Sequence, residues 1–275
     1  MRYLSIAAAI AAVSILGSIQ VASAADMPVK APVGPVAAQY NWTGFYIGGN
    51  VGGGWGSDTG GGWDSFVDPG NNFGTAAYFA AGYNVLPGVK PNGVIGGLQL
   101  GYNWQVSPTW VLGLVADLQA SDMHASSGAT ATPPPGTATT IQSNSSKIDW
   151  FGTLRSRIGY AANNWLFYAT GGLAFGSVKT SLSYYCDTTC FLGPYLFSGS
   201  QTTTNVGWAA GAGIELGLAP RWTVGVEYLH FDLGNISTTA TYVSGIAAFT
   251  VTSTTFTANS KFAGDVVRAM LNYKF

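Results

Sequence analysis

The sequence has few charged residues, few cysteines and histidines, and no long apolar run after residue 24. Charged residues make up 8% of the 275 positions, about a third of the share in soluble domains. The net charge of −1 gives no electrostatic basis for binding nucleic acid. Without a run of about 18 apolar residues, helical membrane spans are excluded beyond residue 24. A chain that is apolar overall but interrupted throughout by polar residues is typical of a transmembrane β-barrel.

The first part of the chain has the features of an export signal. Residues 1–24 contain a charged Arg2, an apolar core and the small-residue cleavage pattern Ala22-Ser23-Ala24. Residues 25–41 are rich in proline and alanine, which predicts an extended periplasmic linker. The remainder, 42–275, is predicted to be one outer-membrane β-barrel.

Eight segments of this remainder alternate between apolar and polar residues with the period of a strand. In the last of them, Val267, Ala269, Leu271, Tyr273 and Phe275 share one face. The eight segments are 42–56, 94–105, 110–119, 148–160, 165–177, 205–218, 222–231 and 264–275. The predicted fold is therefore all-β: an eight-stranded antiparallel transmembrane β-barrel.

Charged residues provide an independent test, because the faces are assigned from apolar residues alone. The charges on the polar face are Asp117, Asp149, Arg155, Arg157, Glu215, Glu227, Arg268 and Lys274. An arginine or lysine facing lipid at mid-depth costs about 2–4 kcal/mol, so these residues are predicted to face the lumen. Six of them are predicted to form an ion-pair network that plugs the barrel: Asp117, Arg155, Arg157, Glu215, Glu227 and Arg268. The alternative is a wet channel lined by the same residues.

Tryptophans and link lengths indicate a membrane barrel rather than a soluble one. Seven tryptophans lie on the apolar face near strand ends, as in the aromatic girdles of outer-membrane barrels: Trp55, Trp104, Trp110, Trp150, Trp165, Trp208 and Trp222. Short links alternate with long ones, which predicts periplasmic turns and extracellular loops. The short links are 106–109, 161–164 and 219–221, and the long ones are 57–93, 120–147, 178–204 and 232–263. Within the last, the Thr-rich stretch 237–257 is predicted to be an extracellular loop or a hairpin extending beyond the membrane.

Several strand motifs resemble a known family. WTGFYIGGNVGGGWG, GGLQLGYNWQ, LRSRIGY, YATGGLAFG and VRAMLNYKF resemble the outer-membrane immunogenic (porin-family) barrels of alphaproteobacteria, which are similar to the OmpA transmembrane barrel. The resemblance implies an abundant surface protein and antigen of the cell outer membrane, in some members a weak porin. It also implies that Tyr273 and Phe275 form the signal read by the barrel-assembly machinery.

Residues that could carry chemistry are sparse. In an exported protein, Cys186 and Cys190 are predicted to pair as a disulfide, and a two-cysteine metal site is the weaker alternative. Asp122, His124 and Ser126 are alternate residues of a polar loop and lack a reason to converge as a triad. We therefore expect no enzyme activity, no metal and no cofactor.

The predicted function is structural and surface-exposed, with little or no permeability, since eight strands leave an interior just wide enough for side chains. The alternatives are a narrow porin for small solutes and a loop-mediated adhesin or receptor. The expected partners are outer-membrane lipid and lipopolysaccharide, the barrel-assembly machinery and a host or surface ligand bound by the loops.

Overall fold

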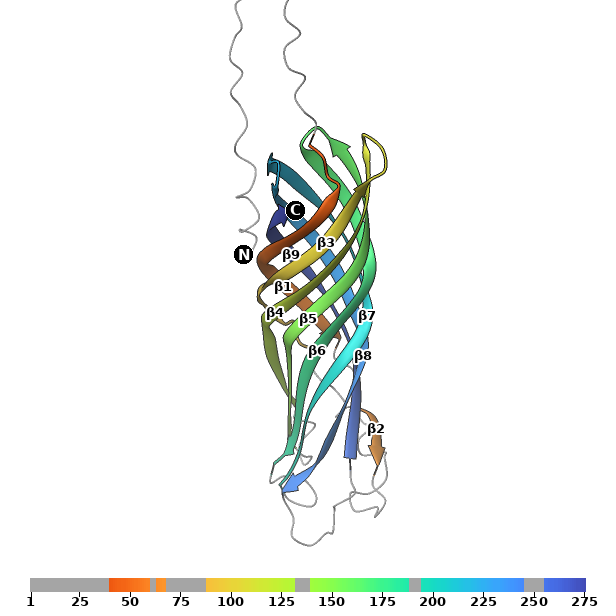
Figure 1. Ribbon diagram of the computed structural model, residues 1–275. Coiled ribbons are helices and arrows are strands. Elements are labelled where there is room, and N and C mark those ends of the chain that lie inside the picture. Colours follow the sequence, from red (N-terminus) through yellow and green to blue (C-terminus); the bar gives the residue numbers. More distant parts are fainter. Residues whose placement is uncertain (1–39, 60–62, 68–87, 132–138, 188–193, 245–254) are drawn as a thin grey trace, which may run out of the picture. The chain divides into compact units, whose positions relative to one another are not determined.

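The computed structural model describes residues 40–59, 63–67, 88–131, 139–187, 194–244 and 255–275. The predicted signal, 1–24, and the linker up to residue 39 lie outside these residues. The described part is built from strands that form one sheet (Figure 1). The strands are β1 (Gly44–Thr59), β2 (Trp63–Val67), β3 (Asn92–Gln105), β4 (Trp110–Ala131), β5 (Thr140–Ala162), β6 (Trp165–Cys186), β7 (Tyr195–Ala219), β8 (Trp222–Ser244) and β9 (Thr255–Lys274). No helix in these ranges is long and apolar enough to cross a membrane.

Eight of the strands close into an antiparallel ring, as the alternation predicts. Each long strand pairs with the next along the chain, and β1 closes the ring against β9 in a register that runs from Tyr46↔Lys274 to Thr59↔Lys261. The short β2 adds to β9 beyond that point, at Phe66↔Phe256. The ends of the ring differ in their connections. We call the end with the two- to four-residue links the turn end and the other the loop end (Figure 1).

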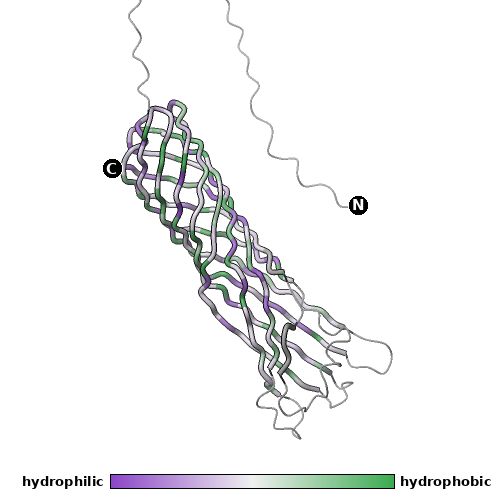
Figure 2. The backbone as a smooth tube through the Cα atoms, turned by 90° about the vertical axis from the view of Figure 1, so that its right-hand side faces the viewer, coloured by the Kyte–Doolittle hydropathy of each residue, from purple (hydrophilic) through white to green (hydrophobic). Residues whose placement is uncertain are grey.

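The outer wall is apolar over the part of the ring nearest the turn end. Hydrophobic and hydrophilic residues alternate along the strands (Figure 2). Leu98 and Leu114 are more than half exposed there, while their strand neighbours Gln99 and Val115 are buried. The seven predicted girdle tryptophans all lie on this outer wall. The predicted aromatic girdles are therefore confirmed.

Three of the long loops were predicted with the wrong bounds, because their flanks continue as paired strands. Strands β4 and β5 pair as far as Ala131↔Thr140, inside the predicted loop 120–147. Strands β6 and β7 do the same as far as Cys186↔Tyr195. Strands β8 and β9 pair up to Thr241↔Thr255, so the flanks of the predicted loop 232–263 and of its Thr-rich stretch are paired strands, as the hairpin alternative expects; residues 245–254 lie outside the described part.

Asp149 was predicted to face the lumen, but it faces outward. Asp149 is exposed on the outer wall, where it forms an ion pair with Lys147 (Oδ1–Nζ 2.9 Å), while Ile148 is fully buried inside. The cause is a bulge between Ile148 and Trp150 in the pairing of β5 with β6. An extra residue in one strand shifts every residue beyond it to the opposite face. The strict alternation used in the prediction therefore fails at this point.

From this bulge to the loop end, apolar side chains face the inside of the ring and polar ones face outward. Leu182, Tyr184 and Phe197 point into the ring and are buried, whereas Ser181 and Ser183 between them face outward. Water surrounds strands that project from a membrane, so the apolar residues turn inward, as in a soluble barrel. The loop-end part of the ring thus has a hydrophobic core of its own.

Candidate functional site: the filled lumen

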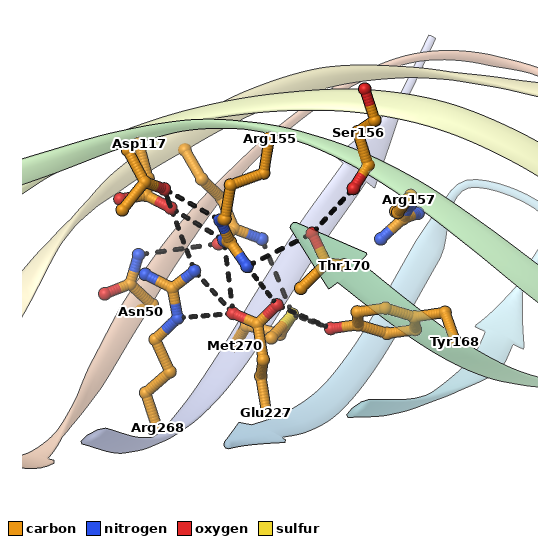
Figure 3. Close-up of polar contacts among 12 residues, drawn as sticks. Asn50, Asp117, Arg155, Ser156, Arg157, Tyr168, Thr170, Glu227, Arg268 and Met270 are labelled. Atoms are coloured by element: carbon orange, nitrogen blue, oxygen red, sulfur yellow. Dashed lines mark hydrogen bonds and ion pairs between the residues drawn. The ribbon is translucent and has the colours of Figure 1, made fainter. Parts of the chain in front are cut away.

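Four charged side chains from four strands meet at the centre of the lumen (Figure 3). Arg155 on β5 reaches Asp117 on β4 and Glu227 on β8, both at 2.8 Å. Arg268 on β9 binds the same two carboxylates, with Nη2 at 2.9 Å from Asp117 Oδ2 and Nε at 2.8 Å from Glu227 Oε2. All four side chains are buried. Each carboxylate therefore receives two guanidinium groups across the ring, which cross-links strands that are not neighbours.

Neutral donors complete this cluster. Thr153 donates to Asp117 at 2.7 Å and accepts from Arg155 Nε at 2.8 Å. The Tyr168 hydroxyl donates to Glu227 at 3.3 Å. A buried charge needs both an opposite charge and further hydrogen bonds to offset its lost hydration. The cluster provides both.

A second ion pair lies closer to the turn end. Arg157 Nη1 is 2.6 Å from Glu215 Oε1, and its Nε donates to Asn103 at 2.8 Å. The guanidinium also lies between the rings of Tyr46 and Tyr168, at 5.1 and 4.9 Å from their centroids. Cation–π contact of this kind stabilises a desolvated arginine. With this pair, three arginines balance three carboxylates.

Glycines directly opposite the two tyrosines on the neighbouring strands make the space for their rings. A Cβ at Gly101 would lie 2.4 Å from the Tyr46 hydroxyl, and one at Gly213 would lie 2.5 Å from that of Tyr168. The absence of a side chain is thus required at these two positions.

Apolar layers lie on the loop side of the charges. Phe231 stacks between Phe151 and Phe262, with ring centroids 5.4 and 6.4 Å apart, and all three are buried. Nearer the loop end, Phe256 contacts the rings of Tyr184 and Phe197. Sequence reasoning missed both layers, although Tyr184, Phe197 and Phe256 all lie in a period-two pattern with small polar residues.

The turn end is closed by residues that precede the first strand. Trp42 is 1% exposed and packs with Val111, Ala161 and Leu166 inside the ring. Its amide donates to Gln105 at 3.0 Å. Beside it, Tyr40 lies over Gly217 and under the Lys274 ammonium, 4.6 Å from the ring centroid. Burial and the nearby Glu215 raise the pKa of the Tyr40 phenol to about 12. This aromatic cap, Tyr40 and Trp42, was not predicted.

The other predicted residues lie apart from the lumen. Tyr273 and Phe275 are on the outer wall at the turn end, with ring centroids 5.4 Å apart, and Arg221 donates to the Tyr273 hydroxyl at 3.0 Å. Their assembly role stays a prediction. Cys186 is buried at the end of β6 and is not a free thiol. Its predicted partner, Cys190, lies outside the described residues, so the disulfide also stays a prediction.

Asp122, His124 and Ser126 sit at alternate exposed positions of β4 rather than in a loop. The Asp122 carboxylate lies 3.6 Å from His124 Nδ1. Within the described ranges, no three His, Cys, Asp or Glu side chains gather as metal ligands. The arrangement found in the lumen neutralises its own charges and fills the ring.

An eight-stranded ring with an apolar outer wall, aromatic girdles and a charged interior defines a transmembrane β-barrel. The sequence matches the model of the outer membrane protein beta-barrel domain over residues 9–275. It is 35% identical over 258 residues to the 31 kDa outer-membrane immunogenic protein of Brucella melitensis, covering 92% of this chain and 93% of that protein. The 22 kDa outer membrane protein of Rhizobium leguminosarum is 30% identical over 207 residues, which cover 74% and 68%.

Solved structures align as well. OprG from Pseudomonas aeruginosa aligns over 86% of this chain and 98% of its own, at 16% identity and a TM-score of 0.36. Ail of Yersinia pestis aligns over 82% and 99%, at 11% identity and a TM-score of 0.30. On the family match and the Brucella relative, the chain belongs to the outer membrane protein β-barrel family, and its location is the outer membrane. The turn end is therefore periplasmic and the loop end extracellular.

Proposed function

We propose that this protein is a closed barrel that anchors and displays an extracellular β-structure and does not conduct solutes. The observation that supports the proposal is the filling of the lumen by successive layers. These are the aromatic cap, the two sets of ion pairs, the Phe231 stack and the Phe256 cluster. A hydrated path would have to cross every one of them.

The rival function is a narrow porin, in which the same charges line a path and select ions. Liposome swelling tests it directly: refolded protein is incorporated into vesicles, and the entry of a pentose-sized sugar and of glycine is followed by light scattering. The closed barrel predicts swelling no faster than in protein-free vesicles. Swelling that rises with the amount of folded protein would favour the porin.

Display at the surface is supported by the length of the extracellular strands. From Thr140 to Asp149, β5 runs on beyond Trp150 of the outer girdle for roughly 30 Å of strand, at about 3.3 Å per residue. The name of the Brucella relative calls it immunogenic, which fits an exposed structure of this kind. The proposed role is non-catalytic.

The other alternative is an adhesin or receptor whose loops bind a host or surface ligand. Binding of such a ligand would then be lost when 245–254 is replaced by a short turn, while the barrel still folds.

A further inference from the structure

The outer wall carries a groove of about 690 Å³ over β4 to β8. Its floor is made by small residues, Ala169, Ala212 and Gly213, and larger side chains form its sides. The side residues include Trp110, Ile158, Phe167, Ile214, Val226 and Tyr228. The volume lies within the range of about 300–1,000 Å³ that holds small-molecule ligands. The groove runs along the membrane-facing wall from Trp110, in the periplasmic girdle on β4, to Tyr228 on β8.

A polar cluster stands at the extracellular end of this groove. Tyr228, which lines the groove, donates its hydroxyl to Asp265 Oδ1 at 2.6 Å. His230 Nδ1 is 2.9 Å from the same oxygen. The ring of Trp208 lies 5.3 Å from that of His230. A carboxylate on a lipid-facing wall is costly. The Asp265 carboxylate is therefore expected to have hydrogen-bond donors and to lie at the depth of the polar headgroups.

The depth of the cluster agrees with the headgroup region of the outer leaflet. The nine residues from Trp222, in the periplasmic girdle, to His230 are enough to cross the hydrocarbon core, which takes about 9–11 residues of tilted strand. Further out on the same face of β9, Lys261 is exposed, with its ammonium 2.8 Å from Asp232 Oδ2. A cation therefore lies above the cluster, about 13 Å along the strand from Asp265.

We propose that the extracellular end of the groove, beside Ala212 and Tyr228, binds an acyl chain of lipopolysaccharide, with the lipid A headgroup placed against His230 and Asp265. The outer leaflet supplies a lipid whose sugars carry hydroxyl, amide and phosphate groups. With Nδ1 engaged by Asp265, the imidazole Nε2 is the atom that can bond to a hydroxyl or amide of the headgroup. Trp208 gives a flat surface beside it, and Lys261 attracts phosphate.

A second groove on the same wall gives an internal control. It measures about 640 Å³ over β1, β3, β8 and β9, and its lining includes Val51, Leu98, Ala269 and Leu271. No charged side chain is among its lining residues. It can take an acyl chain, but none of its lining residues hydrogen-bonds to Asp265 or His230, as Tyr228 of the first groove does. The inference does not depend on whether the barrel conducts.

The test is native mass spectrometry of the full chain, purified in detergent and mixed with hexa-acylated lipid A or with phosphatidylglycerol. Ala212→Leu fills the groove. The double variant His230→Gln with Asp265→Asn removes the imidazole and the carboxylate of the polar cluster. Ala269→Leu fills the control groove. All these residues face outward, and loss of heat-modifiable mobility on gels identifies any variant that has not folded.

We expect lipid A to bind Ala212→Leu and the double variant about tenfold more weakly than the unmodified chain, a change of about 1.4 kcal/mol. Ala269→Leu should bind as the unmodified chain does, and phosphatidylglycerol should bind more weakly than lipid A. Equal binding by all variants would overturn the proposal, as would an equal loss in Ala269→Leu. Phosphatidylglycerol binding as tightly as lipid A would reduce the groove to a general acyl-chain site and overturn the headgroup assignment.

Discussion

The membrane part of the barrel and its extracellular part are built with opposite side-chain patterns. Between the girdles, Leu98 and Leu114 face outward while Arg155 and Glu227 face the lumen. Beyond the outer girdle, serines face outward and Tyr184, with other apolar side chains, fills the ring. The strands are continuous, so the change follows the surroundings: lipid favours an apolar outer wall and water favours an apolar interior. The interior of one ring thus holds ion pairs where lipid surrounds it and packed aromatic side chains where water does.

The largest expected effect comes from breaking the charge cluster. Arg268→Ala leaves Asp117 and Glu227 with Arg155 alone, and loss of one partner of a buried pair costs about 3–5 kcal/mol. The free energy of unfolding is measured by guanidinium titration in lipid vesicles, with tryptophan fluorescence as the signal. Arg221→Ala is the control, because its exposed contact with Tyr273 should contribute only about 0–1 kcal/mol. Equal stability of the two variants would show that the cluster does not hold the ring together.

The apolar layer should respond to truncation nearly as strongly. Phe231→Ala removes the middle ring of the stack and is expected to cost about 3 kcal/mol or more, through lost burial and the cavity left behind. The same titration measures it. Leu114→Ala, on the lipid-facing wall of the membrane part, is the comparison and should cost less. If Leu114→Ala proves the more costly, the extracellular core is not tightly packed.

A smaller change tests how closely the charge layer is packed. At Gly213 a Cβ would lie 2.5 Å from the Tyr168 hydroxyl, so Gly213→Ala should destabilise the barrel by about 1–3 kcal/mol. Gly171→Ala is the matched control on the neighbouring strand: its Cβ would meet nothing closer than 3.8 Å. That variant should stay within about 0.5 kcal/mol of the unmodified chain. A Gly213→Ala barrel of unchanged stability would mean that Tyr168 has room to move.

The smallest effect concerns the tip of the extracellular part. Cys186 and Cys190 are predicted to be joined, so the non-reduced protein should gain no mass on treatment with a thiol alkylating reagent. Reduction before alkylation should add two labels. Two labels without reduction would show that both thiols are free and that the end of β6 is held by strand pairing alone.

The membrane part could be predicted from the sequence because its charges are few. Arg155, Glu227 and Arg268 each interrupt an apolar alternation, and lipid on the outside leaves the lumen as their only place. Asp149 shows the limit of this reasoning, because the bulge beside it has no sequence signal of its own and reverses the face. The contacts among the six lumenal charges also depend on how strands far apart in sequence meet across the ring.

The extracellular part and the cap could not be predicted in the same way. The alternation of Leu182 and Tyr184 with Ser181 and Ser183 is present, but which of its faces lies inward depends on whether water or lipid surrounds the strand. Trp42 is the first residue of the predicted segment 42–56 but lies just before β1, which begins at Gly44, so the alternation does not determine its position. Its burial depends on the width of the periplasmic mouth, which the closed ring determines.

The central claim, that the lumen is closed, is tested most directly by single-channel recording of the refolded protein in planar bilayers. Insertion is verified by protease protection of the same sample. The account predicts no discrete current steps above those of a protein-free bilayer for the unmodified chain. It predicts none for Arg268→Ala either, because the Phe231 stack still blocks the path. Discrete steps from folded, unmodified protein, with an ion selectivity that changes in Arg268→Ala, would contradict the closed barrel and identify a pore.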